Sequence, residues 1–313
     1  MISTIDTISV ILLLEECYED QSAYIATIDR VFSDIGVPCE ILVIANGTGN
    51  FFRSRISQIQ GISHRLRAFE FGNRTTQAVC LKAILKEVKG EILVICGSYQ
   101  QLTDDSIRTV VDAMEDSCDV VSPWRRKRVD PPLNRFQSRV FNWLMRWFVG
   151  AKLHDFSCTV KVVRRTVLEE TELYGNMFRF LPVLAADRGF RVKEVPVRHL
   201  QERGKTGLYR PSDYITRLID IFTLFFNTRF TRKPLRFFSA IGIIFMFFGS
   251  LSMLLLFIER FFFSTPIGNR PFLFLSLLLT IVGVLVSSAG LLGEIIAFTN
   301  GRKKREYTIE KTI

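Results

Sequence analysis

Two long stretches without a charged side chain constrain the folding of this chain more than any other feature. Residues 237–258 and residues 271–293 contain no Asp, Glu, Lys or Arg. A helix of about 20 apolar residues crosses the hydrocarbon core of a bilayer. We therefore predict two membrane-spanning helices rather than a pair of buried core helices, because uncharged runs of this length are rare in water-soluble folds. The glycines within them either let the two helices approach closely or are ordinary glycines of membrane spans: Gly242, Gly249, Gly283 and Gly290.

Basic residues flank the two stretches on one side only. Four precede the first stretch and four follow the second: Arg229, Arg232, Lys233 and Arg236, then Arg302, Lys303, Lys304 and Arg305. The loop between the stretches carries only Glu259, Arg260 and Arg270. Because loops rich in Lys and Arg stay on the cytoplasmic side, we predict that both termini are cytosolic. The chain would then be an integral membrane protein, of the cytoplasmic membrane if it is bacterial, with residues 1–210 in the cytosol.

The chain carries a basic excess, with 41 Lys and Arg against 31 Asp and Glu and a net charge of +10 over 313 residues. This charge fits nucleic acid, an anionic membrane surface or a phosphorylated substrate. Because the basic residues cluster beside the predicted spans, anionic lipid explains them and we expect no nucleic-acid partner. Six cysteines without a C-x-x-C pair argue against a disulfide or zinc framework. Cys80 and Cys96 lie in apolar runs and are interpreted as core residues.

Apolar runs alternate with segments of helical spacing through the first half of the chain. Strands are predicted at residues 8–14, 40–44 and 91–96, with helices at 24–32 and 76–88. This alternation indicates an α/β fold with a mostly parallel sheet covered on both faces. Ligands of such sheets bind beyond the carboxyl ends of the strands. Those ends are Leu14-Glu15-Glu16, Ala45-Asn46-Gly47 and Gly97-Ser98-Tyr99.

An ordered series of segments extends over nearly the whole chain. It comprises Ile8-Ser9-Val10-Ile11, Glu40-Ile41-Leu42-Val43-Ile44-Ala45-Asn46-Gly47-Thr48, Gly90-Glu91-Ile92-Leu93-Val94-Ile95, Asp119-Val120-Val121 with Arg125-Arg126-Lys127-Arg128, Gly189-Phe190 with Glu194-Val195-Pro196-Val197, and Gly290-Leu291-Leu292-Gly293-Glu294. The series resembles the family 2 glycosyltransferases of GT-A fold, specifically the membrane-anchored polyprenyl-phosphate glycosyltransferases (dolichol-phosphate mannose synthase-like). The resemblance implies sugar transfer from a nucleotide sugar to a polyprenyl phosphate.

The chain departs from that family at its acidic motifs. The family's Asp-Asp-Gly-Ser stretch is replaced by Ala45-Asn46-Gly47-Thr48, and its Asp-x-Asp motif by Gly97-Ser98-Tyr99. The opening Pro-x-Tyr-Asn-Glu stretch is replaced by Leu13-Leu14-Glu15-Glu16-Cys17. Active relatives are expected to hold Mg²⁺ or Mn²⁺ on the Asp-x-Asp carboxylates, because these hard cations need oxygen ligands. Gly97, Ser98 and Tyr99 are therefore degenerate metal positions, and no metal or other cofactor is expected here.

Other positions keep residue types that suit the family's site. The positions expected to contact the nucleotide or donor are Glu16, Asn46, Gly47, Gln101, Arg203 and Lys205. The positions expected to contact phosphate or acceptor are Arg125, Arg126, Arg128 and Arg139, because guanidinium groups pair well with phosphate. Asp155 is the candidate catalytic acid. The alternatives are a solvated run of arginines, and an Asp155 that caps a helix or pairs with Arg164.

Two further segments have apolar side chains at helical spacing with arginines beside them. They are residues 133–149, which include Trp143 and Trp147, and residues 213–229. The pattern predicts helices that lie at the membrane surface, where a polyprenyl phosphate would be delivered. The alternative is that both helices face the protein core. The predicted domains are thus a GT-A-like domain at 1–210, a juxtamembrane helix at 211–235, a two-helix hairpin at 236–300 and a basic tail at 301–313.

Three functions remain open at this level. The favoured one is a pseudo-glycosyltransferase that keeps the fold and the anchor, has impaired or lost metal-dependent transfer, and acts as partner or scaffold in lipid-linked glycan or cell-envelope polysaccharide pathways. The second is an active transferase in which arginines stabilise the leaving diphosphate without a metal, with Glu15, Glu16 or Asp155 as base. The third is a module that binds or translocates a lipid-linked glycan. Expected partners are membrane lipid, possible polyprenyl phosphate and nucleotide sugar ligands, and a second copy or a partner membrane protein.

Overall fold

The computed structural model describes residues 7–15, 21–47, 65–127, 129, 131–150, 153–173, 175–200, 211–225, 234–263 and 271–301. Two compact units divide the described part of the chain. The first takes in the residues up to Leu224, and the second begins at Phe225. The first unit is an α/β domain and the second is a helical hairpin.

A seven-stranded sheet forms the centre of the first unit, with the order β3-β2-β1-β4-β6-β5-β7. The strands are β1 (Ile8–Leu14), β2 (Cys39–Asn46), β3 (Leu66–Phe71), β4 (Ile92–Cys96), β5 (Val120–Lys127), β6 (Lys161–Arg164) and β7 (Val192–Arg198). Strands β1 to β4 pair in parallel, and β5 pairs in parallel with β7. Strand β6 runs antiparallel to both β4 and β5. The predicted mostly parallel sheet is therefore confirmed.

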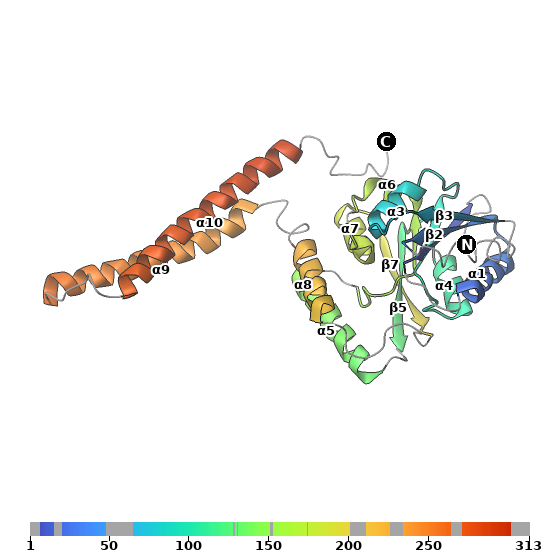
Figure 1. Cartoon of the computed structure of the whole chain (residues 1–313), viewed down its shortest axis with the longest axis horizontal. Coiled ribbons are helices and arrows are strands. Elements are labelled where there is room, and N and C mark those ends of the chain that lie inside the picture. Colours follow the sequence, from blue (N-terminus) through green and yellow to red (C-terminus); the bar gives the residue numbers. More distant parts are fainter. Residues whose placement is uncertain are drawn as a thin grey trace. The chain divides into compact units, whose positions relative to one another are not determined.

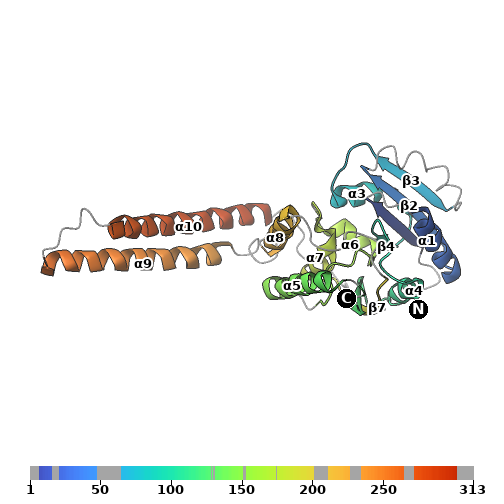
Figure 2. The same ribbon diagram turned by 60° about the horizontal axis from the view of Figure 1, so that its bottom comes forward.

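Helices cover both faces of this sheet, which explains why the central strands are mostly apolar on both sides. All seven residues of β1 are buried, and its side chains alternate between two core clusters. On one face lie α1 (Gln21–Ile35) and α4 (Asp104–Asp112). On the other lie α3 (Gln77–Ile84), α6 (Arg165–Glu170), the 3₁₀ turn η1 (Met177–Phe180) and α7 (Leu181–Asp187), as Figures 1 and 2 show.

Helices α5 (Pro132–Val149) and α8 (Pro211–Phe225) form the segments predicted to be amphipathic. They pack around a third apolar cluster, and Gln137 Nε2 donates a hydrogen bond to the Tyr214 hydroxyl at 2.8 Å. Their outer faces expose large apolar side chains: Phe136, Val140, Trp143 and Trp147 on α5, and Ile215, Leu218, Ile219 and Phe222 on α8. Each helix therefore has both a core-facing side and an exposed apolar side. Contact of that exposed side with a membrane stays a prediction.

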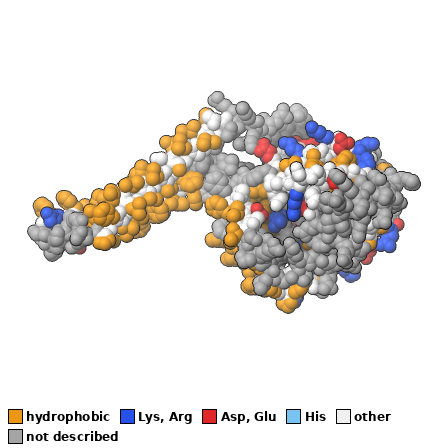
Figure 3. All heavy atoms as spheres, in the orientation of Figure 1, with side chains coloured by type: hydrophobic (Ala, Val, Ile, Leu, Met, Phe, Trp, Pro, Cys, Tyr) orange, Lys and Arg blue, Asp and Glu red, His pale blue; other side chains and the backbone are white. Residues whose placement is uncertain are grey.

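The second unit pairs α9 (Pro234–Phe263) with α10 (Pro271–Gly301). The segments Leu235–Phe262 and Pro271–Ile296 are long and apolar enough to cross a membrane by length and composition. Hydrophobic side chains cover the hairpin in Figure 3. A Cβ atom at Gly283 would lie 2.6 Å from Met246 Cγ, and one at Gly290 would lie 2.7 Å from Phe238 Cβ. The glycines thus permit the close approach of the two helices.

The open end of the hairpin carries a specific polar contact. The Leu235 amide, in the first turn of α9, donates a hydrogen bond to Glu294 Oε2 near the end of α10, at 3.2 Å. The first amides of a helix have no partner within the helix, so this carboxylate satisfies one of them. Glu294 therefore caps the start of α9.

Candidate functional site

The carboxyl ends of three adjacent strands form one edge of the sheet. In the order β2-β1-β4, these strands end at Asn46, Leu14 and Cys96. Directly after β2, Gly47 has φ of 70°, a left-handed conformation that favours glycine. A Cβ atom there would also lie 2.6 Å from Arg74 Cβ. The sheet thus brings the predicted nucleotide positions Asn46 and Gly47 beside the end of β1 and the degenerate metal positions.

Asn46 is completely buried and bonded to the loop before α3. Its Nδ2 donates to the Thr75 carbonyl at 2.8 Å, and its Oδ1 accepts from the Thr75 amide at 2.8 Å. The neighbouring Glu15 accepts from Gln77 Nε2 through Oε2 at 2.7 Å, and from Asn46 Nδ2 through Oε1 at 3.4 Å. Both ends of the Asn46 amide are therefore used within the protein.

The degenerate metal positions Gly97 and Ser98 are likewise engaged by contacts within the protein. A Cβ atom at Gly97 would lie 2.7 Å from Thr159 Oγ1 and 2.9 Å from Thr159 Cβ, so Thr159 occupies the space of a side chain at position 97. Ser98 Oγ donates to the Leu13 carbonyl at 3.0 Å and accepts from the Glu15 amide at 2.9 Å. The Ser98 hydroxyl thus ties the end of β4 to the end of β1.

Gln101 follows β4 and extends this network by bonding to Thr159, just before β6. Its Oε1 accepts from the Thr159 amide at 2.9 Å and from Thr159 Oγ1 at 3.0 Å. Its Nε2 donates to the Tyr99 hydroxyl at 3.1 Å, and its carbonyl accepts from the Leu200 amide at 2.9 Å. We refer to Glu15, Asn46, Ser98, Tyr99 and Gln101 as the donor-side cluster.

A buried ion pair stands on the other side of the same edge. Arg125 Nε donates to Asp155 Oδ2 at 2.7 Å and Arg125 Nη2 donates to Asp155 Oδ1 at 3.1 Å. The two side chains are 0% and 3% exposed. Arg125 Nη2 also donates to Ser157 Oγ at 2.8 Å, and Arg125 Nη1 lies 3.4 Å from His199 Nε2. We refer to these four residues as the acceptor-side cluster.

Asp155 thus has a different partner from the one that the sequence suggested. Arg164 pairs with Asp116 at 3.3 Å and with Asp119 at 3.7 Å. Asp155 Oδ1 also accepts from the Ser157 amide at 3.0 Å. The Asp155 carboxylate and the Arg125 guanidinium therefore stabilise the loop that leads into β6. Their predicted catalytic and phosphate-binding roles are not tested by this geometry.

Sequence reasoning missed one residue of this region, Lys161. It is completely buried at the start of β6, and its Nζ donates to the Cys158 carbonyl at 3.2 Å. Burial lowers the pKa of Lys161, although Cys158 and Asp155 act in the opposite direction. The sequence carries no signal for this position, because a lysine within a short strand is usually on a solvated face.

The remaining predicted arginines lie nearer the surface. Arg126 is exposed, and its guanidinium lies 5.8 Å from the centroid of the Trp124 ring. Trp124 in turn stacks on His154 with ring centroids 4.3 Å apart. Arg139 is exposed on α5. The other predicted site residues, Glu16, Arg128, Arg203 and Lys205, lie outside the described residues.

Comparison with known proteins identifies the region that contains most of these residues, without Glu15 and His199. Residues 17–171 match the family described as Glycosyl transferase family 2. The chain contains a glycosyl transferase family 2 domain. The matched residues begin after β1 and include β2 to β6, Gly97, and the Arg125–Asp155 pair.

Relatives of this chain carry names of one chemical class. The dodecaprenyl-phosphate galacturonate synthase of Rhizobium johnstonii is 27% identical over 241 residues, covering 75% of this chain and 70% of the relative. The undecaprenyl-phosphate 4-deoxy-4-formamido-L-arabinose transferase of Pectobacterium atrosepticum is 24% identical over 320 residues, covering 100% of this chain and 95% of the relative. The predicted resemblance to polyprenyl-phosphate sugar transferases is thereby confirmed.

Solved structures confirm the GT-A fold. Glucosyl-3-phosphoglycerate synthase from Mycobacterium tuberculosis, in complex with Mn²⁺, UDP and phosphoglyceric acid, has a TM-score of 0.51 at 15% identity, covering 72% of this chain and 78% of that chain. Its complex with Mg²⁺ and UDP has a TM-score of 0.50 at 15% identity, covering 72% of this chain and 79% of that chain. At this identity the likeness shows the fold alone.

The donor-side cluster does not fit the divalent cation seen in those neighbours. Within the described ranges, no group of three or more His, Cys, Asp or Glu side chains could hold a metal ion. Mg²⁺ and Mn²⁺ take oxygen ligands, usually with one or two carboxylates. Gly97 supplies no ligand, and the Ser98 hydroxyl makes two hydrogen bonds within the protein. Glu15 is the one carboxylate of the cluster, and both its oxygens accept hydrogen bonds from side chains.

Neither of the two cysteines singled out in the sequence offers a nucleophile. Burial raises the pKa of Cys96 to about 12 and the pKa of Cys80 to about 11. A thiol is reactive as its thiolate, so both stay protonated at neutral pH. Both are fully buried, as expected of core residues.

Proposed function

We propose that this chain is a membrane-anchored glycosyl transferase family 2 protein that has lost metal-dependent sugar transfer. It would serve as partner or scaffold in a pathway of lipid-linked glycan or cell-envelope polysaccharide. One observation carries the proposal: the side chains at the ends of β1, β2 and β4 are bonded to one another, and Thr159 fills the space of a carboxylate at position 97.

The lipid-linked part of the proposal rests on three features. The relatives are named for transfer to dodecaprenyl or undecaprenyl phosphate. Helices α9 and α10 are each long and apolar enough to span a membrane. Helices α5 and α8 expose Trp and Phe side chains, and Trp favours the interface between lipid and water. In this arrangement both termini lie in the cytosol, and α5 and α8 rest on the inner surface of the membrane.

A second candidate is an active transferase that needs no metal, and the exposed arginines favour it. The acceptor phosphate oxygen would form a bond to the anomeric carbon while the bond to the diphosphate leaving group breaks. Arg126 and Arg139 would then stabilise the developing charge on the diphosphate, as preorganised cations can. Glu15 or Asp155 would act as base where the acceptor needs one.

Calorimetric titration of the purified full chain in detergent separates the two candidates. UDP-sugars and GDP-sugars are titrated with and without Mn²⁺, and the Mycobacterium tuberculosis synthase is titrated with UDP in parallel as a positive control. We expect no binding that depends on Mn²⁺. Metal-dependent binding in the micromolar range would overturn the proposal.

Metal-independent binding in the same titration would favour the second candidate. A transfer assay with undecaprenyl phosphate in nanodiscs then decides, because only an active enzyme consumes the nucleotide sugar. If no nucleotide sugar binds, light scattering of the nanodisc sample distinguishes a self-associating chain from one that awaits a different membrane partner.

A further inference from the structure

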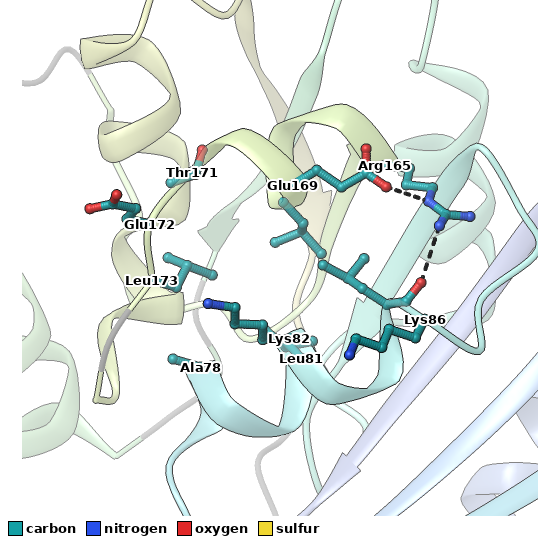
Figure 4. A pocket seen from close by; sticks show the side chains of 11 residues that line it. Ala78, Leu81, Lys82, Lys86, Arg165, Glu169, Thr171, Glu172 and Leu173 are labelled. Carbon is teal, nitrogen blue, oxygen red and sulfur yellow. Dashed lines mark hydrogen bonds and ion pairs between the residues drawn. The ribbon is translucent and has the colours of Figure 1, made fainter. Parts of the chain in front are cut away.

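A cavity lies between α3 and α6, and it shares no lining residue with the donor-side or the acceptor-side cluster. The cavity has a volume of about 350 Å³. One wall is α3 with the turn that follows it, and the other is α6 with the segment up to Leu173 (Figure 4). This volume falls at the lower end of the range of small-molecule sites, so a long polyprenyl chain does not fit inside it.

The floor of this cavity is apolar. Leu81 and Leu168 are buried in the core, and Leu85 and Leu173 pack against the same core from half-buried positions. A ligand in this cavity would therefore contact the carbon atoms of these leucine side chains. An occupant would therefore need an apolar body in addition to any charged group.

Arg165 is already neutralised. Its Nε donates to Glu169 Oε1 at 2.7 Å. Its Nη1 donates to the Val88 carbonyl at 2.8 Å, and its Nη2 donates to the Leu85 carbonyl at 3.2 Å. Arg165 thus binds carbonyl groups beyond the end of α3 and fixes α3 to α6. Neither Arg165 nor Glu169 is left to determine the charge of an occupant.

Two lysines supply the positive charge of the cavity that is not already paired. Lys82 and Lys86 line it from one side, and the structure gives neither of them an ion pair within its described part. In Figure 4 the Lys82 ammonium extends from α3 toward Leu173, whereas the Glu172 carboxylate points away from the cavity. The free charge of the cavity is therefore positive.

The two lysines come from consecutive parts of the chain. Lys82 lies in the last turn of α3, and Lys86 lies in the turn that follows the helix. Cations near the end of a helix can be explained by the helix dipole. Here Arg165 already engages the carbonyls of Leu85 and Val88, so the dipole alone does not explain two more cations.

We propose that this cavity binds a small organic phosphate monoester, with its apolar body on the leucine floor and its dianionic phosphate between Lys82 and Lys86. A dianion matches two ammonium groups, and a charge-assisted hydrogen bond to each would orient it. Helix α3 also supplies Gln77, which donates to Glu15 in the donor-side cluster. The occupant therefore contacts the helix whose first residue closes that cluster.

The test uses phenyl phosphate as the probe, titrated calorimetrically into the purified full chain in nanodiscs. Inorganic phosphate tests the charge alone, and benzyl alcohol tests the apolar body alone. We expect phenyl phosphate to bind at least tenfold more tightly than either. Equal affinity of phenyl phosphate and inorganic phosphate would overturn the proposal, because it would show that the leucine floor contributes nothing.

Matched variants locate the binding. The double variant Lys82→Ala and Lys86→Ala should lose at least tenfold in affinity for phenyl phosphate, whereas Lys89→Ala, which removes an exposed lysine outside the cavity, should lose less than twofold. Arg126→Ala with Arg139→Ala should also lose less than twofold, which excludes binding at the candidate transfer site. Undiminished binding by the double lysine variant, with its melting temperature unchanged, would contradict the proposal. The outcome is independent of nucleotide-sugar binding, so it neither supports nor harms the proposed function.

Discussion

The donor-side and acceptor-side clusters lie on the same edge of one sheet, yet they are built from different chemistry. The donor side is held mainly by neutral groups, with amide and hydroxyl side chains bonded to backbone atoms. The acceptor side is held by a full ion pair, Arg125 with Asp155, that is almost completely buried. The one carboxylate of the donor side, Glu15, is thus bonded to neutral amides, whereas the acceptor-side carboxylate is bonded to a guanidinium.

The contrast follows from the cost of burying charge. An uncompensated buried carboxylate is expensive, whereas a buried amide is tolerated once its donors and acceptors are bonded. Without a cation, acidic residues at the ends of β2 and β4 would have no counter-charge among the donor-side residues. Asn46 and Gly97 at those ends avoid this cost. The hydrogen bonds of the donor side are therefore those expected of a protein that folds without a metal.

The largest effect is expected from breaking the ion pair. Asp155→Ala should lower the free energy of unfolding by about 3–5 kcal/mol, because it leaves the Arg125 guanidinium buried without its counter-charge. Denaturant unfolding of the full chain in detergent, followed by tryptophan fluorescence, measures it. Asp104→Ala is the matched control, since Asp104 pairs with Arg30 at 3.2 Å on the surface and should contribute at most about 1 kcal/mol.

Joint replacement sharpens the same test. Arg125→Met with Asp155→Leu removes both charges and should recover most of the stability that Asp155→Ala loses, because apolar pairs often replace buried ion pairs at little cost. If Asp155→Ala and Asp104→Ala cost the same, the acceptor side does not depend on its charge, and the contrast between the two clusters fails.

The next effect comes from restoring an acid to the donor side. Gly97→Asp should lower the free energy of unfolding by about 1–3 kcal/mol, because its Cβ would press on Thr159. Adding Thr159→Ala should relieve part of that loss, although it removes a hydrogen bond to Gln101. Thermal unfolding measures stability, and electron paramagnetic resonance of Mn²⁺ measures binding. Stable Mn²⁺ binding by Gly97→Asp alone would show that the site is open after all.

The smallest effect is expected within the neutral network. Tyr99→Phe removes one hydroxyl that accepts from Gln101 Nε2, and should cost about 0.5–1.5 kcal/mol. The same unfolding measurement applies. A loss as large as that of Asp155→Ala would mean that the donor side is as sensitive to single changes as the ion pair, and the distinction drawn above would not hold.

Much of the architecture could be predicted from the sequence because it depends on local periodicity. The run at β1 is apolar on both faces, and α9 and α10 are apolar all round, so few structures can bury or cover them. The pairing of Arg125 with Asp155 could not be predicted from local periodicity. The two residues are 30 positions apart, and the one partner that the sequence suggested for Asp155 was Arg164.

The same limit applies to the donor side. The lack of an Asp-x-Asp motif is visible in the sequence. The contact between Gly97, just after β4, and Thr159, just before β6, depends on how these two strands pair. Buried Lys161 and the cavity between α3 and α6 likewise depend on packing among distant segments. Sequence shows which chemical groups are present, and tertiary structure determines which of them are already engaged.

The cap on α9 has a consequence for the order in which a ribosome makes this chain. Glu294 lies 59 residues after the Leu235 amide that it accepts from. At synthesis rates of about 5–20 residues per second, the first helix waits roughly 3–12 seconds before its cap exists. Until then, one of the first amides of α9 lacks the partner that Glu294 supplies. In the proposed membrane arrangement, the first span is therefore completed only when the second one follows it, and the hairpin settles in the bilayer as a pair.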